Sequence, residues 1–460
     1  MATLDFKIQN GSGISGNEVF IGFWGSDLNA TINGVPMKSI QESTWYKLSE
    51  IDSFVIGVTT SGRIYVAYYD PFSPTAAGGE PSIVAPNSPA YKKRFDKFEL
   101  TFDGSHYGVA DLTAIDYWSI PMSLETEKGG AKIDSLDGVK VGSTANEIHT
   151  SLSKLSNPVQ SGKTGQEIIE AFANVGQPLA QGIQDQLENP ASGLVTDDSG
   201  NFVRIIGPNT YPAFGHPASD PAKNLPPGLP FMPYNTFLEY FQYLIDTFGP
   251  GKATPSGFSQ LGGGKIAQLA GEFTGSSAGS GPPCEDQTYK LWASIDNNFN
   301  LTIEGTGSKV GAIKMTITKW DLLNPAATYG GNPTFSLNGN APQTPQNDIY
   351  AHILGDFFAG LNIGAIGSSV TVGEKVVGEM PSSEWFSTLP KAGYLFDKLW
   401  GGQVTNYWNQ WAQELNPRSD AYNFAYAERF SAPQISIDPS AVDTLTLILL
   451  DADVTSSPNV

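Results

Sequence analysis

The spacing of apolar and polar residues in the first quarter of the chain is typical of β-structure. Up to about residue 125, short runs of β-branched and aromatic residues are bounded by Gly, Asn, Asp and Ser, and none has the 3.6-residue period of a helix. Strands are predicted at residues 19–23, 54–58 and 63–68. This part of the chain is therefore expected to form a sandwich or a barrel.

The middle of the chain carries apolar stripes at the three- and four-residue spacing of amphipathic helices. These stripes cover residues 168–187, 237–248, 349–357 and 407–415. Pro178 lies within the first stripe, where it is expected to kink or divide the helix. β-like runs at 299–303 and 312–317 and a Gly- and Ser-rich loop at 274–282 lie between the stripes. The middle is therefore predicted to be a mixed α/β domain.

The last part of the chain returns to a strand pattern, with apolar runs at 432–437 and 444–450. Because both ends of the chain are β, we expect them to pair in one domain into which the middle is inserted. The predicted domains are residues 1–135 plus 420–460 for the β domain and 136–419 for the insertion. The expected fold is α+β and mainly β, a barrel-like β-sandwich with a wide cleft beside the mixed α/β domain.

Composition and charge narrow the possible partners. The chain has 460 residues, of which 50 are Gly and 32 are Pro, and only 16% are charged, which suits short strands and many turns. The formal charge of −20 repels nucleic acid and anionic membranes, and the sequence has no basic cluster to offset it. A neutral polysaccharide meets no such barrier. We expect a monomer that binds neither nucleic acid nor membranes.

Residues that commonly bind metals or direct secretion are sparse. Cys284 is the only cysteine, so neither an intrachain disulfide nor a cysteine-based zinc cluster can form. The four histidines are scattered without metal-ligand spacing, and no metal or organic cofactor is expected. Residues 1–7 lack the features of a signal peptide, and no later segment has the ~20 apolar residues of a membrane span. We expect a soluble chain, either a mature secreted form or a cytoplasmic one.

A polar row on one predicted strand offers the first candidate chemistry. The row consists of Glu99, Thr101 and Asp103, which alternate with Phe98, Leu100 and Phe102. This alternation predicts a strand with its apolar face in a core and its polar face on an open surface. A half-exposed strand without any function has the same pattern, so the alternation by itself leaves both interpretations open.

A second carboxylate, Asp116, interrupts the apolar and aromatic run 112–121, which costs desolvation energy unless the carboxylate is paired or faces a cleft. In a hairpin whose turn is centred on residues 107–108, Asp116 lies opposite Glu99, roughly 5 Å away at Cβ. If residues 103–108 form the whole loop, Asp116 is offset by about 13 Å along the strand. Inverting glycosidases hold their carboxyl groups about 6.5–9.5 Å apart and retaining ones about 5–5.5 Å, so both outcomes stay open.

Several motifs, in a consistent order, resemble those of glycoside hydrolase family 64. They lie at residues 62–65, 84–89, 98–101, 115–122, 202–208 and 422–426. Members of this family are β-1,3-glucanases with a thaumatin-like β domain. The resemblance implies a secreted, extracellular endo-acting enzyme for β-1,3-glucan of the laminarin or curdlan type, similar to the laminaripentaose-producing members.

The resemblance also implies roles for individual residues. Glu99 matches the family's catalytic Glu and Asp116 its catalytic Asp. Because members are inverting, Glu99 is expected to be the general acid and Asp116 the general base. The candidate substrate-binding residues are Thr101, Asp103, Thr113 and Trp118. The first three match groove positions of the family. Trp118 is also one of the aromatic residues that could surround the general acid with an apolar environment.

Three parts of the chain depart from the family pattern, one of them the segment 117–119, which is more aromatic than usual. The family more often has an amide where this chain has Asp103, and an acidic pair where this chain has Ala427 and Glu428. Both expected catalytic carboxyl groups are retained, which favours the enzyme. The alternatives are a thaumatin-like β-glucan-binding protein that lacks catalysis and a structural protein built on the same scaffold.

Overall fold

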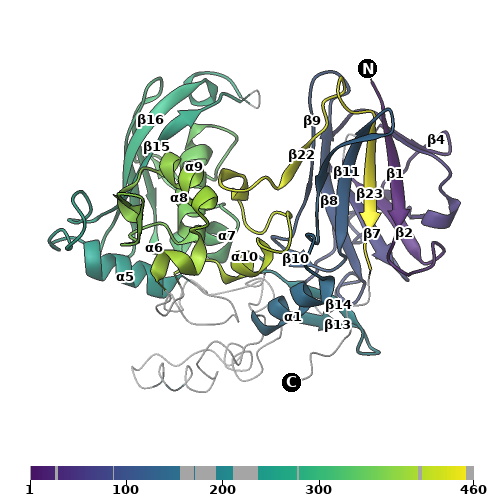
Figure 1. Ribbon diagram of the computed structural model, residues 1–460, viewed down its shortest axis with the longest axis horizontal. Coiled ribbons are helices and arrows are strands. Elements are labelled where there is room, and N and C mark those ends of the chain that lie inside the picture. The colour runs from purple at the N-terminus through teal and green to yellow at the C-terminus, as the bar shows by residue number, and fades with distance from the viewer. Residues whose placement is uncertain are drawn as a thin grey trace.

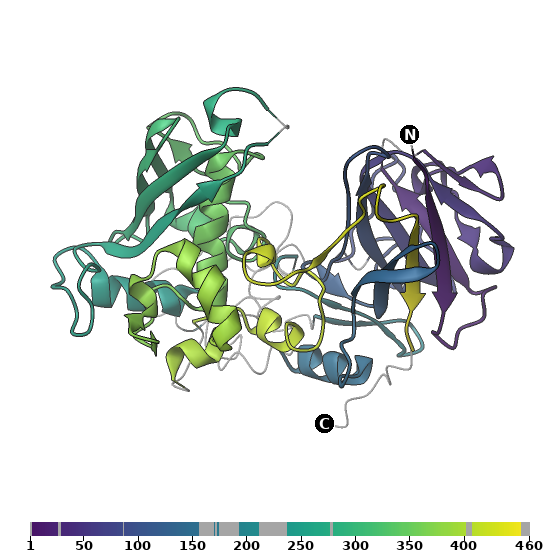
Figure 2. The same cartoon turned by 45° about the horizontal axis from the view of Figure 1, so that its top comes forward.

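The chain folds into two lobes, each with its own hydrophobic core (Figure 1). The computed structural model describes residues 2–25, 29–85, 87–155, 193–210, 237–276, 279–401 and 407–451, together with positions 170 and 173. The first lobe contains both the earliest and the latest strands of the chain, and the second lobe is built from the segment between them (Figure 2).

The first lobe is a sandwich of two β-sheets. One is seven-stranded, in the order β12 (Ala131–Leu136), β11 (Met122–Lys128), β23 (Thr444–Leu449), β1 (Leu4–Asn10), β6 (Phe54–Ile56), β3 (Ala30–Ile32) and β4 (Val35–Pro36). The other is six-stranded, in the order β22 (Gln434–Ser436), β9 (Gly108–Leu112), β8 (Phe95–Phe102), β7 (Thr59–Tyr68), β2 (Val19–Trp24) and β5 (Tyr46–Lys47). Apolar side chains from both sheets share one core, which confirms the predicted mainly β sandwich.

The two ends of the β region pair in one sheet. β23 lies between β1 and β11, parallel to β1 with Asp5 opposite Thr444, and antiparallel to β11 with Met122 opposite Leu449. Its side chains are buried along nearly the whole strand, as a central strand requires. The predicted pairing of the ends is therefore confirmed, while the predicted domain boundaries stay a prediction.

A smaller sheet and two helices extend the first core. The three-stranded sheet has the order β10 (Tyr117–Trp118), β14 (Phe202–Ile206) and β13 (Leu194–Thr196), and the helices are α1 (Ala145–Leu155) and α10 (Gln410–Leu415). Ile148, Phe202 and Trp411 belong to the first core. Side chains from within the predicted insertion, 136–419, thus complete the core of the β-sandwich.

The second lobe combines an antiparallel sheet with helices. Its five-stranded sheet has the order β15 (Lys265–Phe273), β16 (Gln287–Ile295), β17 (Leu301–Gly307), β18 (Gly311–Ile317) and β19 (Ser336–Leu337), and a short hairpin pairs β20 (Thr371–Val372) with β21 (Lys375–Val376). The helices are α5 (Leu238–Phe248), α6 (Lys319–Leu322), α7 (Pro325–Thr328), α8 (Ile349–Ile363) and α9 (Ser382–Ala392). Short 3-10 turns lie at Ile40–Glu42 and Leu48–Glu50 in the first lobe and at Pro282–Cys284, Val377–Glu379, Phe396–Trp400 and Ala427–Arg429 in the second. The predicted mixed α/β character of this region is confirmed.

The helices of the second lobe follow the apolar stripes of the sequence. α5 coincides with the predicted helix at 237–248, and α10 lies within the stripe at 407–415. α8 begins at the N-cap Asp348, whose carboxylate accepts hydrogen bonds from two backbone N–H groups, and it continues to Gly364 at φ 84°, beyond the predicted end. The predicted helix at 168–187 lies outside the described residues, apart from positions 170 and 173. No helix among the described residues is long and apolar enough to span a membrane.

Candidate active site

The outer face of β8 carries the polar row that the sequence pattern predicted. Phe98, Leu100 and Phe102 are almost completely buried in the first core. Successive side chains of a strand point to opposite faces, so Glu99 and Thr101 lie on the outer face of the sheet. β8 and β9 lie on the side of the first lobe that is turned toward the second lobe (Figure 1). The row therefore borders the space between the lobes.

The pairing of β8 with β9 brings a third carboxylate to Glu99. Phe102 pairs with Gly108 across a tight loop, so Glu99 lies opposite Asp111 and not opposite Asp116. Neither predicted register is correct, although the one with the loop at 103–108 differs by only a single residue. A one-residue slip reverses which side chains share a face, and the observed register puts two acids on the same face.

Asp116 reaches this face because the chain leaves the sheet after Leu112. The Ala114 N–H donates to the Tyr422 carbonyl at 2.7 Å, and the Gly207 N–H donates to the Asp116 carbonyl at 2.7 Å. β10 then pairs with β14 and not with β8. The position of Asp116 is thus determined by segments far away in the sequence.

A buried carboxylate holds the chain that follows Asp116. The Oδ2 atom of Asp96 accepts hydrogen bonds from the N–H groups of Ser119 and Ile120, both at 3.0 Å, and its Oδ1 accepts from Lys97 N–H at 2.8 Å. Burial raises the pKa of Asp96 to about 7, although these backbone N–H groups oppose the shift. Asp96 fastens the segment after Asp116 to the beginning of β8.

The carboxylate of Asp116 is surrounded by donors. Its Oδ2 lies 3.6 Å from Lys97 Nζ, and its Oδ1 accepts hydrogen bonds from Asn209 Nδ2 at 2.9 Å and Thr210 Oγ1 at 3.2 Å. The Lys97 side chain is 8% exposed and that of Asp116 36%. A largely buried cation and two polar side chains therefore orient a carboxylate that stays open to solvent.

Glu99 has a cation on the other side of the strand. Arg63, which lies opposite Glu99 on β7, donates from Nε to Glu99 Oε1 at 3.1 Å and from Nη1 to Glu80 Oε2 at 2.9 Å. The Tyr65 hydroxyl also donates to Glu80. The Glu99 side chain is 40% exposed. One guanidinium is thus shared between two carboxylates at the rim of the site.

Asp111 is a site residue that the sequence reasoning missed. Burial is the main cause that raises its pKa to about 7, with further contributions from the charges of Glu99 and Glu428, while Lys97 opposes the shift. The sequence held one signal for Asp111, because a five-residue loop in the hairpin would have placed it opposite Glu99. The loop length could not be known before the strands were seen.

Glu428 approaches the site from the second lobe. It is exposed and accepts a hydrogen bond from the Tyr422 hydroxyl at 3.1 Å. The adjacent Arg429 forms an ion pair with the buried Asp356 of α8 at 3.2 Å. The turn that carries Glu428 is therefore anchored in the second core while its acid lies near the outer face of β9.

The predicted substrate-binding residues have different surroundings. Thr101 Oγ1 accepts a hydrogen bond from Ser61 N–H at 3.0 Å, and Thr113 forms a parallel bridge with Tyr422. Asp103 Oδ1 accepts the N–H groups of Ser105, His106 and Tyr107 in the loop between β8 and β9. These hydrogen bonds hold the pKa of Asp103 well below its usual range. Thr101 and Thr113 lie beside the acids, whereas Asp103 shapes the turn.

Trp118 is not brought to the outer face. Its side chain is only 5% exposed and packs against Phe202 in the first core, with ring centroids 5.8 Å apart. The pairing of β10 with β14 turns Trp118 inward and Tyr117 toward a separate small cluster that includes Phe95. The expectation that Trp118 contacts substrate is therefore not met by this structure, since its ring is inaccessible.

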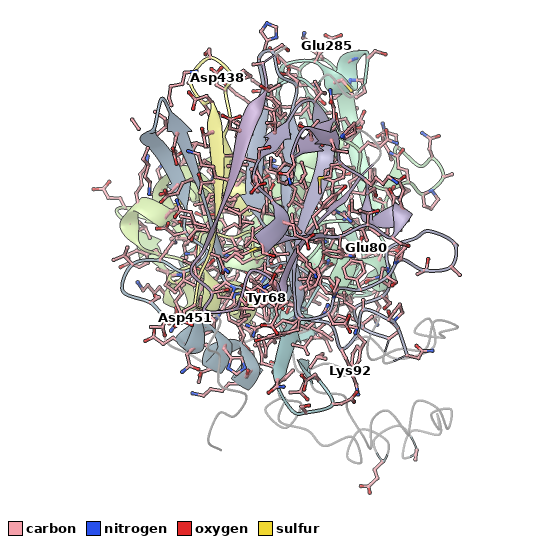
Figure 3. All side chains as sticks on the ribbon, turned by 90° about the vertical axis from the view of Figure 1, so that its right-hand side faces the viewer. Tyr68, Glu80, Lys92, Glu285, Asp438 and Asp451 are labelled. Carbon is pink, nitrogen blue, oxygen red and sulfur yellow. The ribbon has the colours of Figure 1, made fainter. Side chains whose placement is uncertain are left out.

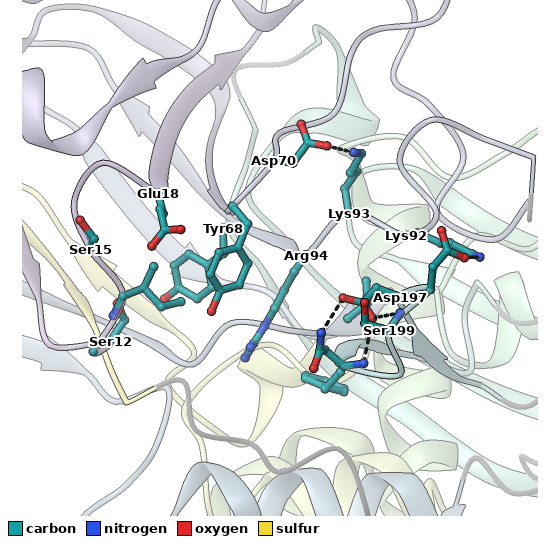
Figure 4. Close-up of a pocket in the computed structure, with 17 residues that line it drawn as sticks. Ser12, Ser15, Glu18, Tyr68, Asp70, Lys92, Lys93, Arg94, Asp197 and Ser199 are labelled. Carbon is teal, nitrogen blue, oxygen red and sulfur yellow. Dashed lines mark hydrogen bonds and ion pairs between the residues drawn. The ribbon is translucent and has the colours of Figure 1, made fainter.

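A polar cavity of about 900 Å³ lies elsewhere in the first lobe (Figure 4). Its lining includes Arg94, whose guanidinium carbon lies 5.4 Å from the ring centroid of Tyr68 and 5.2 Å from that of Phe202. Lys93 in its wall is paired with Asp70. None of the three acids, Glu99, Asp111 and Asp116, lines this cavity. Lys92 lines this cavity, and Glu80 shares Arg63 with Glu99 at the candidate site; Figure 3 shows Lys92 well below Glu80.

No group of His, Cys, Asp and Glu that could hold a metal occurs among the described residues.

Comparisons with known proteins bear on the identity of this site. The sequence model of the β-1,3-glucanases of glycoside hydrolase family 64 matches residues 2–161, the segment that contains the three acids. The resemblance to glycoside hydrolase family 64 is confirmed. A comparison with curated protein sequences gives no match.

Two solved structures of β-1,3-glucanases share the fold. A laminaripentaose-producing β-1,3-glucanase in complex with laminaritetraose is 15% identical, with 98% of this chain and 100% of that chain covered and a TM-score of 0.53. A β-1,3-glucanase domain of family 64 from Clostridium beijerinckii is 11% identical, with 97% and 98% covered and a TM-score of 0.51. The likeness extends over both lobes and shows that the chain has the same fold as these two structures.

Proposed function

We propose that this protein is an endo-acting β-1,3-glucanase for glucans of the laminarin or curdlan type. The observation that carries the proposal is the pair of solvent-accessible carboxylates, Glu99 and Asp116, which border the outer face of β8 within the segment matched by the family. A thaumatin-like, secreted enzyme, as the resemblance implies, is part of the proposal, and we expect it to be a monomer. The net charge of −20 presents no barrier to a neutral glucan chain.

In the proposed reaction the two acids act from opposite sides of the scissile bond. Glu99 donates its proton to the departing glycosidic oxygen, while Asp116 removes a proton from the water that attacks the anomeric carbon. The surroundings of Asp116 suit a base, because Lys97, Asn209 and Thr210 orient its carboxylate as an acceptor. Each turnover thus consumes one water and leaves Glu99 without its proton and Asp116 with one.

An inverting reaction is part of the proposal, as the resemblance implies. Asp116 contacts Lys97, which lies two positions before Glu99 on the same face of β8, so the two acids belong to one site. Inverting glycosidases separate their carboxyl groups by about 6.5–9.5 Å, which leaves room for the attacking water. We therefore expect the α-anomer to appear first from a β-1,3-glucan. Proton NMR of fresh laminarin digests reports the first anomer, and initial release of the β-anomer would contradict the inverting proposal.

The activity itself is tested by reducing-end release from laminarin and curdlan. Glu99→Gln and Asp116→Asn are expected to lower kcat by about 10²–10⁴-fold each, because each removes one proton-transfer group. The matched controls are Glu304→Gln, an exposed side chain of β17 in the second lobe, and Asp198→Asn, which pairs with Lys92 far from the site. Both controls are expected to keep the wild-type rate. Unchanged activity in both site variants would exclude this acid pair.

One contact favours the non-catalytic alternative. Arg63 donates a hydrogen bond to Glu99 at 3.1 Å and places a cation beside it, whereas a general acid must itself donate a proton. A glucan-binding protein without catalysis would need no proton there. Retention of the wild-type protein on insoluble curdlan, with no reducing ends released between pH 4 and 8, would establish the binding protein and exclude the enzyme.

A further inference from the structure

We propose that Asp111 is a positioning residue that shares one proton with Glu99 and keeps that proton available to Glu99 near neutral pH. This inference rests on the proposed glucanase function, because it concerns the acid of that reaction. In this inference Asp111 affects the reaction only by its effect on Glu99, and it does not contact the sugar.

The first argument is geometry. Glu99 and Asp111 are direct cross-strand partners, and both point to the outer face of the sheet. Directly opposed residues of an antiparallel pair have their Cβ atoms about 4.5–5.5 Å apart, which lets the two carboxyl groups contact each other. Two negative charges at this distance repel, so the pair holds one proton over a wide pH range.

The second argument concerns the side on which the proton rests. Glu99 has Arg63 as its partner on β7, whereas the corresponding neighbour of Asp111 on β22 is the neutral Gln434. The nearby cation Lys97 is engaged with Asp116. The proton of the resting pair is therefore expected on Asp111. In agreement with this geometry, burial and the charges of Glu99 and Glu428 raise the pKa of Asp111 to about 7.

The third argument is the chemistry of turnover. Protonated Asp111 transfers its proton to the Glu99 carboxylate, which becomes the neutral acid, and Asp111 becomes the carboxylate in exchange. Arg63 also donates to Glu80, and the negative charge of Glu80 partly offsets the attraction between Arg63 and the Glu99 carboxylate. After Glu99 has protonated the leaving oxygen, the pair regains one proton from solvent. The exchange moves a single proton and requires no further reactant.

The test is the pH dependence of laminarin hydrolysis by Asp111→Asn. An amide cannot supply a proton, so in this variant Glu99 has lost its proposed proton donor. The basic limb of the kcat profile should move to lower pH by about one unit or more, with an approximately 10-fold loss at pH 7 and a change of less than about 3-fold at pH 5. Asp111→Glu should restore part of the limb, and Asp198→Asn should leave the profile unchanged.

Two kinetic outcomes would overturn the inference. A uniform loss at every pH would mean that Asp111 acts by itself or only maintains the fold, and an unmoved basic limb would mean that Glu99 keeps its proton without Asp111. Thermal melting of each variant establishes that the proteins compared are folded.

A direct titration separates this inference from the proposed function. Carboxyl carbon NMR of protein labelled at Asp should contain a resonance that titrates near neutral pH and disappears in Asp111→Asn. If the wild type hydrolyses no glucan, the proposed enzyme fails whatever the titration shows. If Asp111 titrates near its ordinary value, the shared proton is excluded even in an active enzyme.

Discussion

The carboxylate of Asp116 lies 3.6 Å from the ammonium group of Lys97, two positions from Glu99 on the same face of β8. The lysine comes from the middle of the sheet, whereas Asp116 belongs to a segment that has already left it. This ion pair joins β8 to the segment that carries Asp116. The distance between Glu99 and Asp116 therefore depends on Lys97 and not on a direct contact between the two acids.

Asn209 should matter for rate more than for affinity, because it holds Asp116 by a 2.9 Å hydrogen bond. A Cβ atom on Gly330 of the second lobe would lie 2.4 Å from Asn209 Oδ1 and 2.7 Å from the Ala326 carbonyl oxygen, so the Asn209 side chain and the local backbone would have to shift. We expect Asn209→Ala and Gly330→Ala each to lower kcat by about 10-fold with little change in KM, since one oriented hydrogen bond is lost.

The double variant provides the sharper measurement. If both changes act through the same contact with Asp116, their effects on kcat should not add. Gly16→Ala is the control, because its new methyl group meets only ordinary van der Waals contacts. Additive losses would show that Gly330 acts independently of Asn209.

Asp111 should make the protein less stable as the pH rises. Its pKa is raised to about 7 in the folded protein from an ordinary value of 3.8, so between these pH values the folded state holds a proton that the unfolded chain has lost. The stabilisation is fully present below about pH 4 and disappears as the pH rises through 7. Relative to Asp111→Asn, we expect the wild type to lose about 4 kcal/mol in free energy of unfolding between pH 4 and 8, since each pKa unit corresponds to about 1.4 kcal/mol. Urea unfolding at several pH values measures this difference, and parallel curves would contradict it.

Arg429 should be required for the stability of the second lobe and for the turn that carries Glu428. Arg429→Met removes the partner of Asp356, whose side chain is 4% exposed, and leaves a buried carboxylate without its cation. Such a loss costs about 3–5 kcal/mol. Arg418→Met breaks a more exposed pair with Glu414 and should cost less than about 1 kcal/mol. Equal losses in denaturant unfolding would show that the Arg429 ion pair is of little importance.

Trp118 should behave as a core residue and not as a sugar-binding one. Trp118→Ala is expected to lower the free energy of unfolding by about 3–5 kcal/mol because it leaves a cavity beside Phe202. Trp118→Phe should keep KM for laminarin within about 2-fold, since the ring has no access to the substrate. A large rise in KM at unchanged stability would return Trp118 to the binding site.

Local patterns were sufficient to predict what depends on neighbouring residues. The alternation around Phe98 and Leu100 predicted which face of β8 is buried, because strand side chains have a period of two wherever the strand lies. The stripe at 237–248 predicted α5 for the same reason, with a period of 3.6. α9 was not predicted, since it has few buried apolar residues, among them Trp385 and Leu389, and contains a proline.

The sequence by itself determined the strands, the outward direction of Glu99 and the presence of an acid in the apolar run at Asp116, and the family resemblance suggested how the two could act together. Only the tertiary structure decided that Asp111 faces Glu99 and that Asn209 holds Asp116. The loop length sets the first relationship, and segments 93 residues apart meet in the second. Such contacts depend on the packing of the whole chain, and no local period encodes them.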